Sequence, residues 1–183
     1  MVSKIFCIIL LICLSPILLI VSITIIVDDG FPIIFRQKRV GQNNSHFWIY
    51  KFRTMKKETL DIPTHLMKEG ATLYTVIGPF LRKYSIDELP QLINVLKGDM
   101  TFIGPRPALY NQGDLIDLRA KAGVNRLVPG VTGWAQVNGR DELSIPNKVK
   151  MDEYYLKNQS LWLDVKILFM TVFKVFKTEG VSY

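Results

Sequence analysis

The sequence has little from which a disulfide framework or a Cys/His metal site can be built. Its 183 residues include two cysteines, Cys7 and Cys13, and both lie in an apolar N-terminal run, where they serve as small hydrophobic residues. Neither of the two histidines, His46 and His65, has a second His or a Cys at ligand spacing. This content excludes a disulfide-stapled fold and argues against a Cys/His metal centre.

Acidic residues are missing from a long segment that follows the apolar run. The stretch from Phe31 to Lys57 contains seven Lys and Arg residues and no Asp or Glu. The whole chain carries a net charge of +7. Such a basic yet apolar chain predicts anionic partners beside a membrane, with nucleic acid as the competing interpretation. By the positive-inside rule, this segment and the domain after it belong on the cytosolic side.

Charged residues are also absent from Ile5 to Val27, a run of 23 positions interrupted by Ser15 and Pro16. Roughly 20 apolar residues can cross a bilayer core, and no small-residue cleavage site precedes Asp28, so a retained membrane anchor is expected. Two geometries agree with this pattern. One is a spanning helix kinked at Pro16, and the other is a helix broken there that returns to the side it entered.

The remaining pattern predicts an α+β fold that is mainly helical, with an anchor over residues 1–28 and one cytosolic, membrane-associated catalytic domain over residues 29–183. Short strands at 32–35 and 47–52 flank a turn signal at 41–44, which indicates a β-hairpin. Helices are expected at 77–83, 85–97, 109–123, 149–156 and 161–177. The last of these is either an interfacial amphipathic helix or a core helix.

The segment from Ser85 to Leu92 places two adjacent carboxylates, Asp87 and Glu88, at the start of an expected helix. Ser85 and Glu88 have the spacing of a capping box, and Pro90 is positioned to distort the first turn. Acids in a first turn usually complement the helix dipole and do nothing else. Adjacent carboxylates also suit catalysis, so both interpretations stay open at this point.

Two further segments have the chemistry of an anion site. Arg106 lies between Pro105 and Pro107, which restrict the backbone and so present the guanidinium rigidly to a phosphate, unless the segment is only a stiff surface turn. Residues 129–140 hold three glycines around Trp134. Either close backbone approach to a ligand or a pair of tight turns explains these glycines.

Four motifs in this order resemble those of the bacterial sugar transferases and, more narrowly, of the small monotopic phosphoglycosyl transferases. They are KFRTM at 51–55, DELPQ at 87–91, the segment from Gly98 to Pro107, and PGVTGWAQVNGR at 129–140. The resemblance covers essentially the whole chain. Each motif alone is weak, but their joint order and spacing are specific.

The resemblance implies transfer of a phosphosugar from a UDP-sugar, of the N-acetylated hexosamine type, to a polyprenyl phosphate such as undecaprenyl phosphate. UMP is released, and the step begins glycoconjugate assembly at the bacterial cytoplasmic membrane. The implied cofactor is Mg²⁺, held by Asp87 and Glu88. Asp87 is the implied nucleophile and forms a covalent phosphosugar intermediate, which the lipid phosphate then attacks.

The same resemblance implies further site residues. A carboxylate that attacks a diphosphate is repelled by its negative charge, so cations are needed to neutralise the phosphate oxygens. The N–H groups of the helix start are expected to help bind the anion. The predicted phosphate-binding cations are Arg106, Arg82, Lys51 and Arg53. The residues predicted near the substrate or nucleotide are Trp134, Gln136, Asn138 and Arg140.

The resemblance also implies that the anchor is re-entrant, broken at Ser15 and Pro16, and that phospholipid is a partner. Nucleic acid is not expected as a partner, and a homodimer is left open. Two other functions remain as alternatives: a non-catalytic membrane-tethered module that binds anionic lipid or nucleic acid, and a glycosyl transferase that moves only the sugar and releases UDP.

Overall fold

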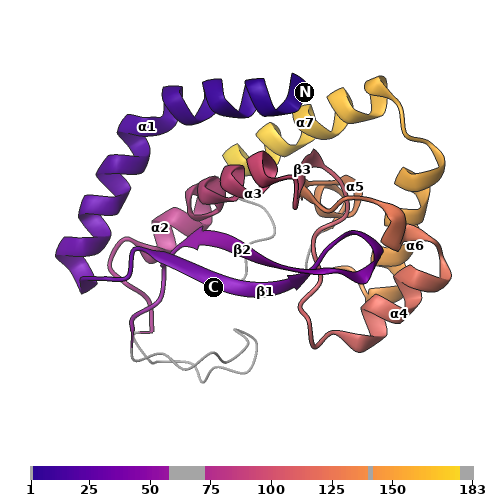
Figure 1. Cartoon of the computed structure of the whole chain (residues 1–183), viewed down its shortest axis with the longest axis horizontal. Coiled ribbons are helices and arrows are strands. Elements are labelled where there is room, and N and C mark those ends of the chain that lie inside the picture. Colours follow the sequence, from indigo (N-terminus) through magenta and orange to yellow (C-terminus); the bar gives the residue numbers. More distant parts are fainter. Residues whose placement is uncertain (1, 58–72, 140–141, 178–183) are drawn as a thin grey trace.

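The computed structural model describes residues 2–57, 73–139 and 142–177, in which helices outnumber strands (Figure 1). This confirms the prediction of a mixed, mainly helical fold. In chain order the elements are α1 (Val2–Asp29), β1 (Ile34–Val40), η1 (Gln42–Asn44), β2 (His46–Phe52), α2 (Gly78–Lys83), η3 (Ile86–Gln91), α3 (Leu92–Lys97), β3 (Thr101–Ile103), α4 (Gly113–Lys121), η4 (Val124–Arg126), β4 (Gly130–Thr132), α5 (Trp134–Val137), α6 (Ile145–Lys157) and α7 (Leu161–Lys177).

The predicted hairpin is present and longer than expected. β1 and β2 pair antiparallel from Ile34 opposite Phe52 to Val40 opposite His46. The first strand therefore takes in the basic residues after Phe35, because pairing along β2 outweighs their weak strand preference. Figure 1 shows this hairpin crossing the molecule with α2 near one end and α4 near the other.

Helix α1 is long and apolar enough to cross a membrane by length and composition. Its backbone is helical throughout, with Pro16 inside, and Figure 1 shows it bent into two arms. Pro16 has no N–H to donate to the carbonyl of Ile12, four residues earlier. The Ser15 hydroxyl donates to that carbonyl instead, at 2.7 Å, so the Ser-Pro pair bends the helix without leaving this acceptor unpaired.

Both arms of α1 pack against the rest of the chain. In the first arm, buried Cys7 belongs to a core cluster with Phe47 of β2 and Leu92 of α3. In the second arm, buried Ile25 belongs to a cluster with Leu81 of α2. The opposite side of α1 exposes large apolar side chains from both arms, among them Ile5, Phe6, Ile12, Leu19, Ile20 and Val27.

A short parallel pair, β3 with β4, was not predicted from the sequence. It pairs Thr101 with Gly130 and Ile103 with Thr132. A side chain on Gly130 would collide with the backbone of Gly104, which lies against it. The glycines at 130 and 133 therefore permit close approach of two segments of this chain. This differs from both explanations considered for them, a ligand or tight turns.

The three predicted C-terminal helices are present as α4, α6 and α7, two of them with other ends than predicted, and the short helix α5 was not predicted. The helix expected at 109–123 is α4, which is shorter and followed by η4, whereas α6 begins four residues before the expected start. Helix α7 has the predicted bounds. It buries Leu163 and Ile167 in the core and exposes Trp162, Phe169 and Phe173, so one apolar face packs inside and another remains uncovered.

Candidate active site

The carboxylate pair lies in η3, a 3₁₀-helix that continues directly into α3. Ser85 before it is left-handed, with φ of 54°, and its side chain makes no capping hydrogen bond, so the predicted capping box is wrong. Pro90 has no N–H to bond the carbonyl of Ile86, and this favours the tighter 3₁₀ turn. The expected distortion at Pro90 is thus confirmed, and the turn that carries the carboxylates is 3₁₀ where an α-helical turn was expected.

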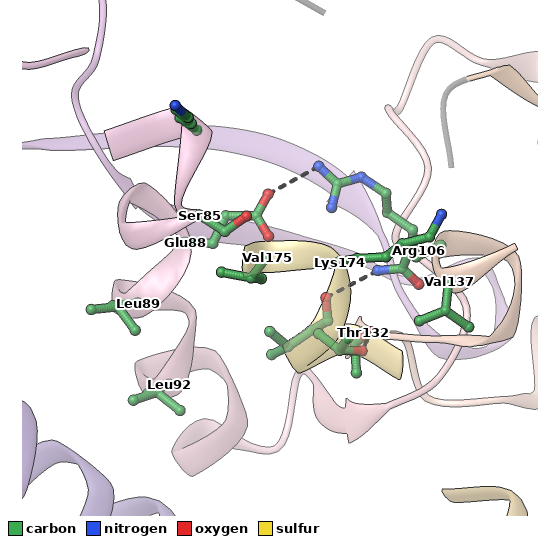
Figure 2. Close-up of a pocket in the computed structure, with 13 residues that line it drawn as sticks. Ser85, Glu88, Leu89, Leu92, Arg106, Thr132, Val137, Lys174 and Val175 are labelled. Atoms are coloured by element: carbon green, nitrogen blue, oxygen red, sulfur yellow. Dashed lines mark hydrogen bonds and ion pairs between the residues drawn. The ribbon is translucent and has the colours of Figure 1, made fainter. Parts of the chain in front are cut away.

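Glu88 is held by two cations from distant parts of the chain. Lys51 Nζ on β2 lies 2.7 Å from Glu88 Oε1, and Arg106 Nη2 lies 3.1 Å from the same oxygen. Figure 2 shows the Arg106 guanidinium reaching Glu88 from the segment after β3. The structure therefore brings together three of the predicted site residues, which are separated by up to 55 positions in the sequence.

Asp87 is buried beside this cluster, with 7% of its surface exposed and Lys51 Nζ 3.9 Å from Oδ2. Burial raises the pKa of Asp87, and the charge of Glu88 raises it further, while Lys51, Arg82 and Arg106 oppose the rise. The pKa of Lys51 is lowered, mainly because burial disfavours its charged form. The neighbouring cations therefore favour the ionised form of Asp87, but burial outweighs them, so its pKa lies above the ordinary value.

Two other predicted cations lie in different settings. Arg82 on α2 donates from Nη1 to the Tyr74 hydroxyl at 2.9 Å, and its charge lowers the pKa of Asp87 from nearby. Arg53 is buried and makes an ion pair with Asp29 at the end of α1, at 3.0 Å. It also donates to the Gly30 carbonyl at 2.8 Å, so in this structure it links the hairpin to the end of α1 and does not reach Glu88.

The residues predicted from the glycine-rich segment also lie in different surroundings, and only some of them are near Glu88. Gln136 lines a cavity together with Glu88. Trp134 stacks on Tyr154, with ring centroids 5.6 Å apart, and is not among the residues that line this cavity. Asn138 Nδ2 donates to the Trp134 carbonyl at 2.8 Å and so closes α5. Arg140 lies outside the described residues.

Sequence reasoning missed the residues that hold Arg106 in place. Arg119 on α4 donates from Nη1 to the Arg106 carbonyl at 2.8 Å. Its Nε and Nη2 donate to one oxygen of Asp152, at 3.0 and 2.6 Å, and Asp152 is 1% exposed. Arg39 Nη1 donates to the next carbonyl, that of Pro107, at 3.0 Å. No local motif marks these pairs, because their members meet only in the folded chain.

A cavity of about 170 Å³ opens beside the carboxylate pair. It lies among α2, η3, β4, α5 and α7, and the Thr132 and Thr171 hydroxyls bond at 2.7 Å across its wall. Its polar lining residues include Lys83, Ser85, Glu88, Arg106 and Lys174. The ion-paired Glu88 and Arg106 thus line a cavity that is partly open to solvent (Figure 2).

The carboxylate oxygens at this site can be compared with the ligands that Mg²⁺ usually takes in proteins. Within the described ranges there is no group of three or more His, Cys, Asp or Glu residues that could hold a metal ion. Mg²⁺ is usually bound by one or two carboxylates, with water and substrate phosphate oxygens completing its shell. The adjacent carboxylates of Asp87 and Glu88 fit that mode, provided that a phosphorylated substrate supplies the other oxygens.

Comparison with known proteins agrees with the motifs. The family model described as bacterial sugar transferase matches residues 1–178. The chain is 44% identical to the uncharacterized sugar transferase EpsL of Bacillus subtilis (strain 168), over 94% of this chain and 84% of EpsL.

Two larger relatives have named activities. The UDP-N-acetylgalactosamine-undecaprenyl-phosphate N-acetylgalactosaminephosphotransferase of Aeromonas hydrophila is 41% identical, over 86% of this chain and 38% of that protein. The UDP-glucose:undecaprenyl-phosphate glucose-1-phosphate transferase of Escherichia coli (strain K12) is 36% identical, over 93% of this chain and 38% of that protein. The chain thus spans less than two fifths of these two relatives and most of EpsL. It belongs to the bacterial sugar transferase family and is a sugar transferase enzyme, as its motifs predicted.

Proposed function

We propose that this chain is a phosphoglycosyl transferase that moves a sugar phosphate from a UDP-sugar to a polyprenyl phosphate, such as undecaprenyl phosphate, and releases UMP. The observation that carries the proposal is the buried Asp87 beside a Glu88 that is ion-paired to Lys51 and Arg106. A carboxylate nucleophile next to fixed cations suits attack on a diphosphate. Relatives named as undecaprenyl-phosphate sugar-phosphate transferases support the same reaction.

In the first step an Asp87 carboxylate oxygen attacks the sugar-bearing phosphorus of the UDP-sugar. A bond forms between that oxygen and the phosphorus, and the bond from the phosphorus to the bridging oxygen breaks. UMP leaves with the electron pair of the broken bond. Lys51 and Arg106 lie where they can neutralise charge on the phosphate oxygens, and Arg82 adds a third positive charge near Asp87.

In the second step an oxygen of the lipid phosphate attacks the same phosphorus. Its bond to Asp87 breaks, the carboxylate is regenerated, and the product is a polyprenyl diphosphate sugar. Mg²⁺ held by Asp87 and Glu88 would supply Lewis-acid stabilisation of phosphate charge. The low exposure of Asp87 helps to keep water away from the acyl phosphate that links Asp87 to the phosphosugar between the two steps.

The anchor is proposed to be re-entrant, so that it enters and leaves on the cytosolic face of the cytoplasmic membrane. Two observations support this geometry. Cys7 in the first arm and Ile25 in the second both pack against the same domain, which draws both ends of α1 to one side. The segment after α1 is basic and lacks acidic residues up to Lys57, as the positive-inside rule expects of a cytosolic segment.

The donor sugar is proposed to be an N-acetylated hexosamine. The relative named for N-acetylgalactosamine transfer is 41% identical over most of this chain. Another relative, 36% identical, is named for galactose transfer. UDP-glucose and UDP-galactose are therefore the alternatives that a donor panel must include.

The test is nucleotide release from a panel of UDP-sugars with polyprenyl phosphate and Mg²⁺. Asp87→Asn is expected to abolish UMP release, and Glu88→Gln to reduce it strongly, while Asp114→Asn on the exposed start of α4 serves as a matched control with full activity. Release of UDP would show transfer of the sugar alone. Absence of any nucleotide release would support the binding-module alternative, which strongly salt-dependent DNA binding would identify further. Full UMP release from Asp87→Asn would overturn the assignment of Asp87 as the nucleophile.

A further inference from the structure

The cavity beside the carboxylate pair is lined by two chemically different sets of side chains. The charged set includes Glu88 and Arg106, which are ion-paired to each other, together with Lys83 of α2 and Lys174 of α7. The rest of its lining includes the aliphatic side chains of Leu89, Leu92, Val131, Val137 and Val175. A matching ligand therefore has an anionic head and a branched hydrocarbon body.

The size of the cavity favours one of the two proposed substrates over the other. A pocket that encloses a drug-sized ligand measures about 300–1,000 Å³, whereas this one measures about 170 Å³. A UDP-sugar is larger than this space and polar along its whole length, and the five aliphatic lining residues offer its hydroxyl and amide groups no side-chain hydrogen bonds, although Ser85, Thr132, Gln136 and Thr171 also line the cavity. The head and first carbon units of a prenyl chain match both the space and the lining.

Helix α7 forms one wall of this cavity and also carries an exposed apolar surface. Thr171, Lys174 and Val175 line the cavity, at the spacing of one helix face. On the other side of the same helix Phe169, Val172 and Phe173 are at least half exposed. Helix α7 therefore has the cavity on one face and uncovered apolar side chains on another, and Figure 2 shows Val175 opposite the segment that carries Ser85 and Glu88.

We propose that this cavity is the acceptor site, which binds the phosphate and the first isoprene units of the polyprenyl phosphate. Lys83 and Lys174 bind the phosphate, and the aliphatic side chains of η3, β4, α5 and α7 receive the isoprene units. The inference rests on the proposed function for the identity of the lipid, and it goes further by assigning the two substrates to different spaces. The UDP-sugar then reaches Asp87 from outside this cavity.

The experiment fills the cavity from α7 with Val175→Phe and compares it with Val172→Phe, three residues away on the exposed face. Val175→Phe is expected to raise the KM for polyprenyl phosphate at least about tenfold, which corresponds to about 1.4 kcal/mol, and to leave the KM for the UDP-sugar unchanged. Val172→Phe is expected to change neither. Lys174→Met is expected to raise the acceptor KM, and Lys174→Arg to restore it.

Binding of farnesyl phosphate, a short polyprenyl phosphate, gives a readout that needs no turnover. Parent protein is expected to bind it, Val175→Phe to weaken binding at least about tenfold, and farnesol to bind more weakly than farnesyl phosphate. An unchanged acceptor KM, an equal rise in the donor KM, or farnesyl phosphate binding that Val175→Phe leaves intact would each overturn the assignment. If no UDP-sugar yields UMP while these binding differences hold, the proposed function fails and the lipid site stands.

Discussion

Replacement of Arg119 by methionine tests how the site is held together. Arg119 is the donor that links buried Asp152 to the Arg106 carbonyl, at 2.6 and 2.8 Å. Removal of one partner from a buried ion pair costs about 3–5 kcal/mol, because the remaining charge stays buried without compensation. In a chain of this size each kcal/mol shifts the Tm by about 2–4 °C, so a loss of roughly 6–20 °C is expected.

The double variant Arg119→Met/Asp152→Leu separates stability from positioning. With both charges replaced by apolar side chains, most of the lost stability is expected to return, since such replacements are often neutral or stabilising. The Arg106 carbonyl still lacks its donor, so turnover is expected to stay low. A misplacement of about 1 Å at a reacting group costs up to about a hundredfold in rate.

The assay is thermal unfolding in detergent micelles together with UMP release from the same preparations. Asp114→Asn, on the exposed part of α4, controls for a charge change on that helix. A Tm loss below about 3 °C in Arg119→Met would mean that the pair contributes less than about 1 kcal/mol. Full turnover in the double variant would refute the idea that Arg119 positions Arg106.

Three further changes test other parts of the structure. Lys51→Met removes a charge that lowers the pKa of Asp87, so the acidic limb of the pH–rate profile is expected to move to higher pH, and an unmoved limb would contradict this assignment. Gly130→Ala places a methyl group against the backbone of Gly104 and is expected to lower the free energy of unfolding in denaturant by at least about 1–3 kcal/mol. Gly113→Ala is the control, because a side chain at Gly113 meets no atom within 4 Å. Pro16→Ala restores a backbone N–H donor and is expected to straighten α1. A straight α1 would expose the buried Cys7 thiol to labelling by a maleimide, and unchanged labelling of Cys7 would show that Pro16 does not set the bend.

Local sequence was a good guide to the elements that depend on local patterns. The hairpin followed from two apolar strands and a turn signal, and the bounds of α7 followed from its apolar residues and flanking sequence. The end of α3 at Gly98, with φ of 90°, agrees with the expected glycine stop. Such features depend on interactions within a few residues, so neighbouring positions carry enough information to predict them.

Predictions failed where a local preference competed with a long-range contact. The capping box expected from Ser85 and Glu88 does not form, because Glu88 pairs with Lys51 and Arg106, which the fold brings to it. Similarly, Arg53 lies two residues after Lys51, directly beyond the end of β2, yet it pairs with Asp29 at the end of α1. The two residues were equivalent by spacing, and only the packing of α1 on the hairpin distinguished them.

The sequence by itself determined the apolar anchor, the basic segment after it, the adjacent carboxylates, the rigid Pro-Arg-Pro segment and the family. These are properties of residue type and spacing along the chain. Only the tertiary structure decided that Lys51 and Arg106 share one oxygen of Glu88, that Arg119 and Asp152 support Arg106, and that a cavity lies between the carboxylates and α7. The physical reason is that charge pairing and burial act through space, between residues that the chain separates by tens of positions.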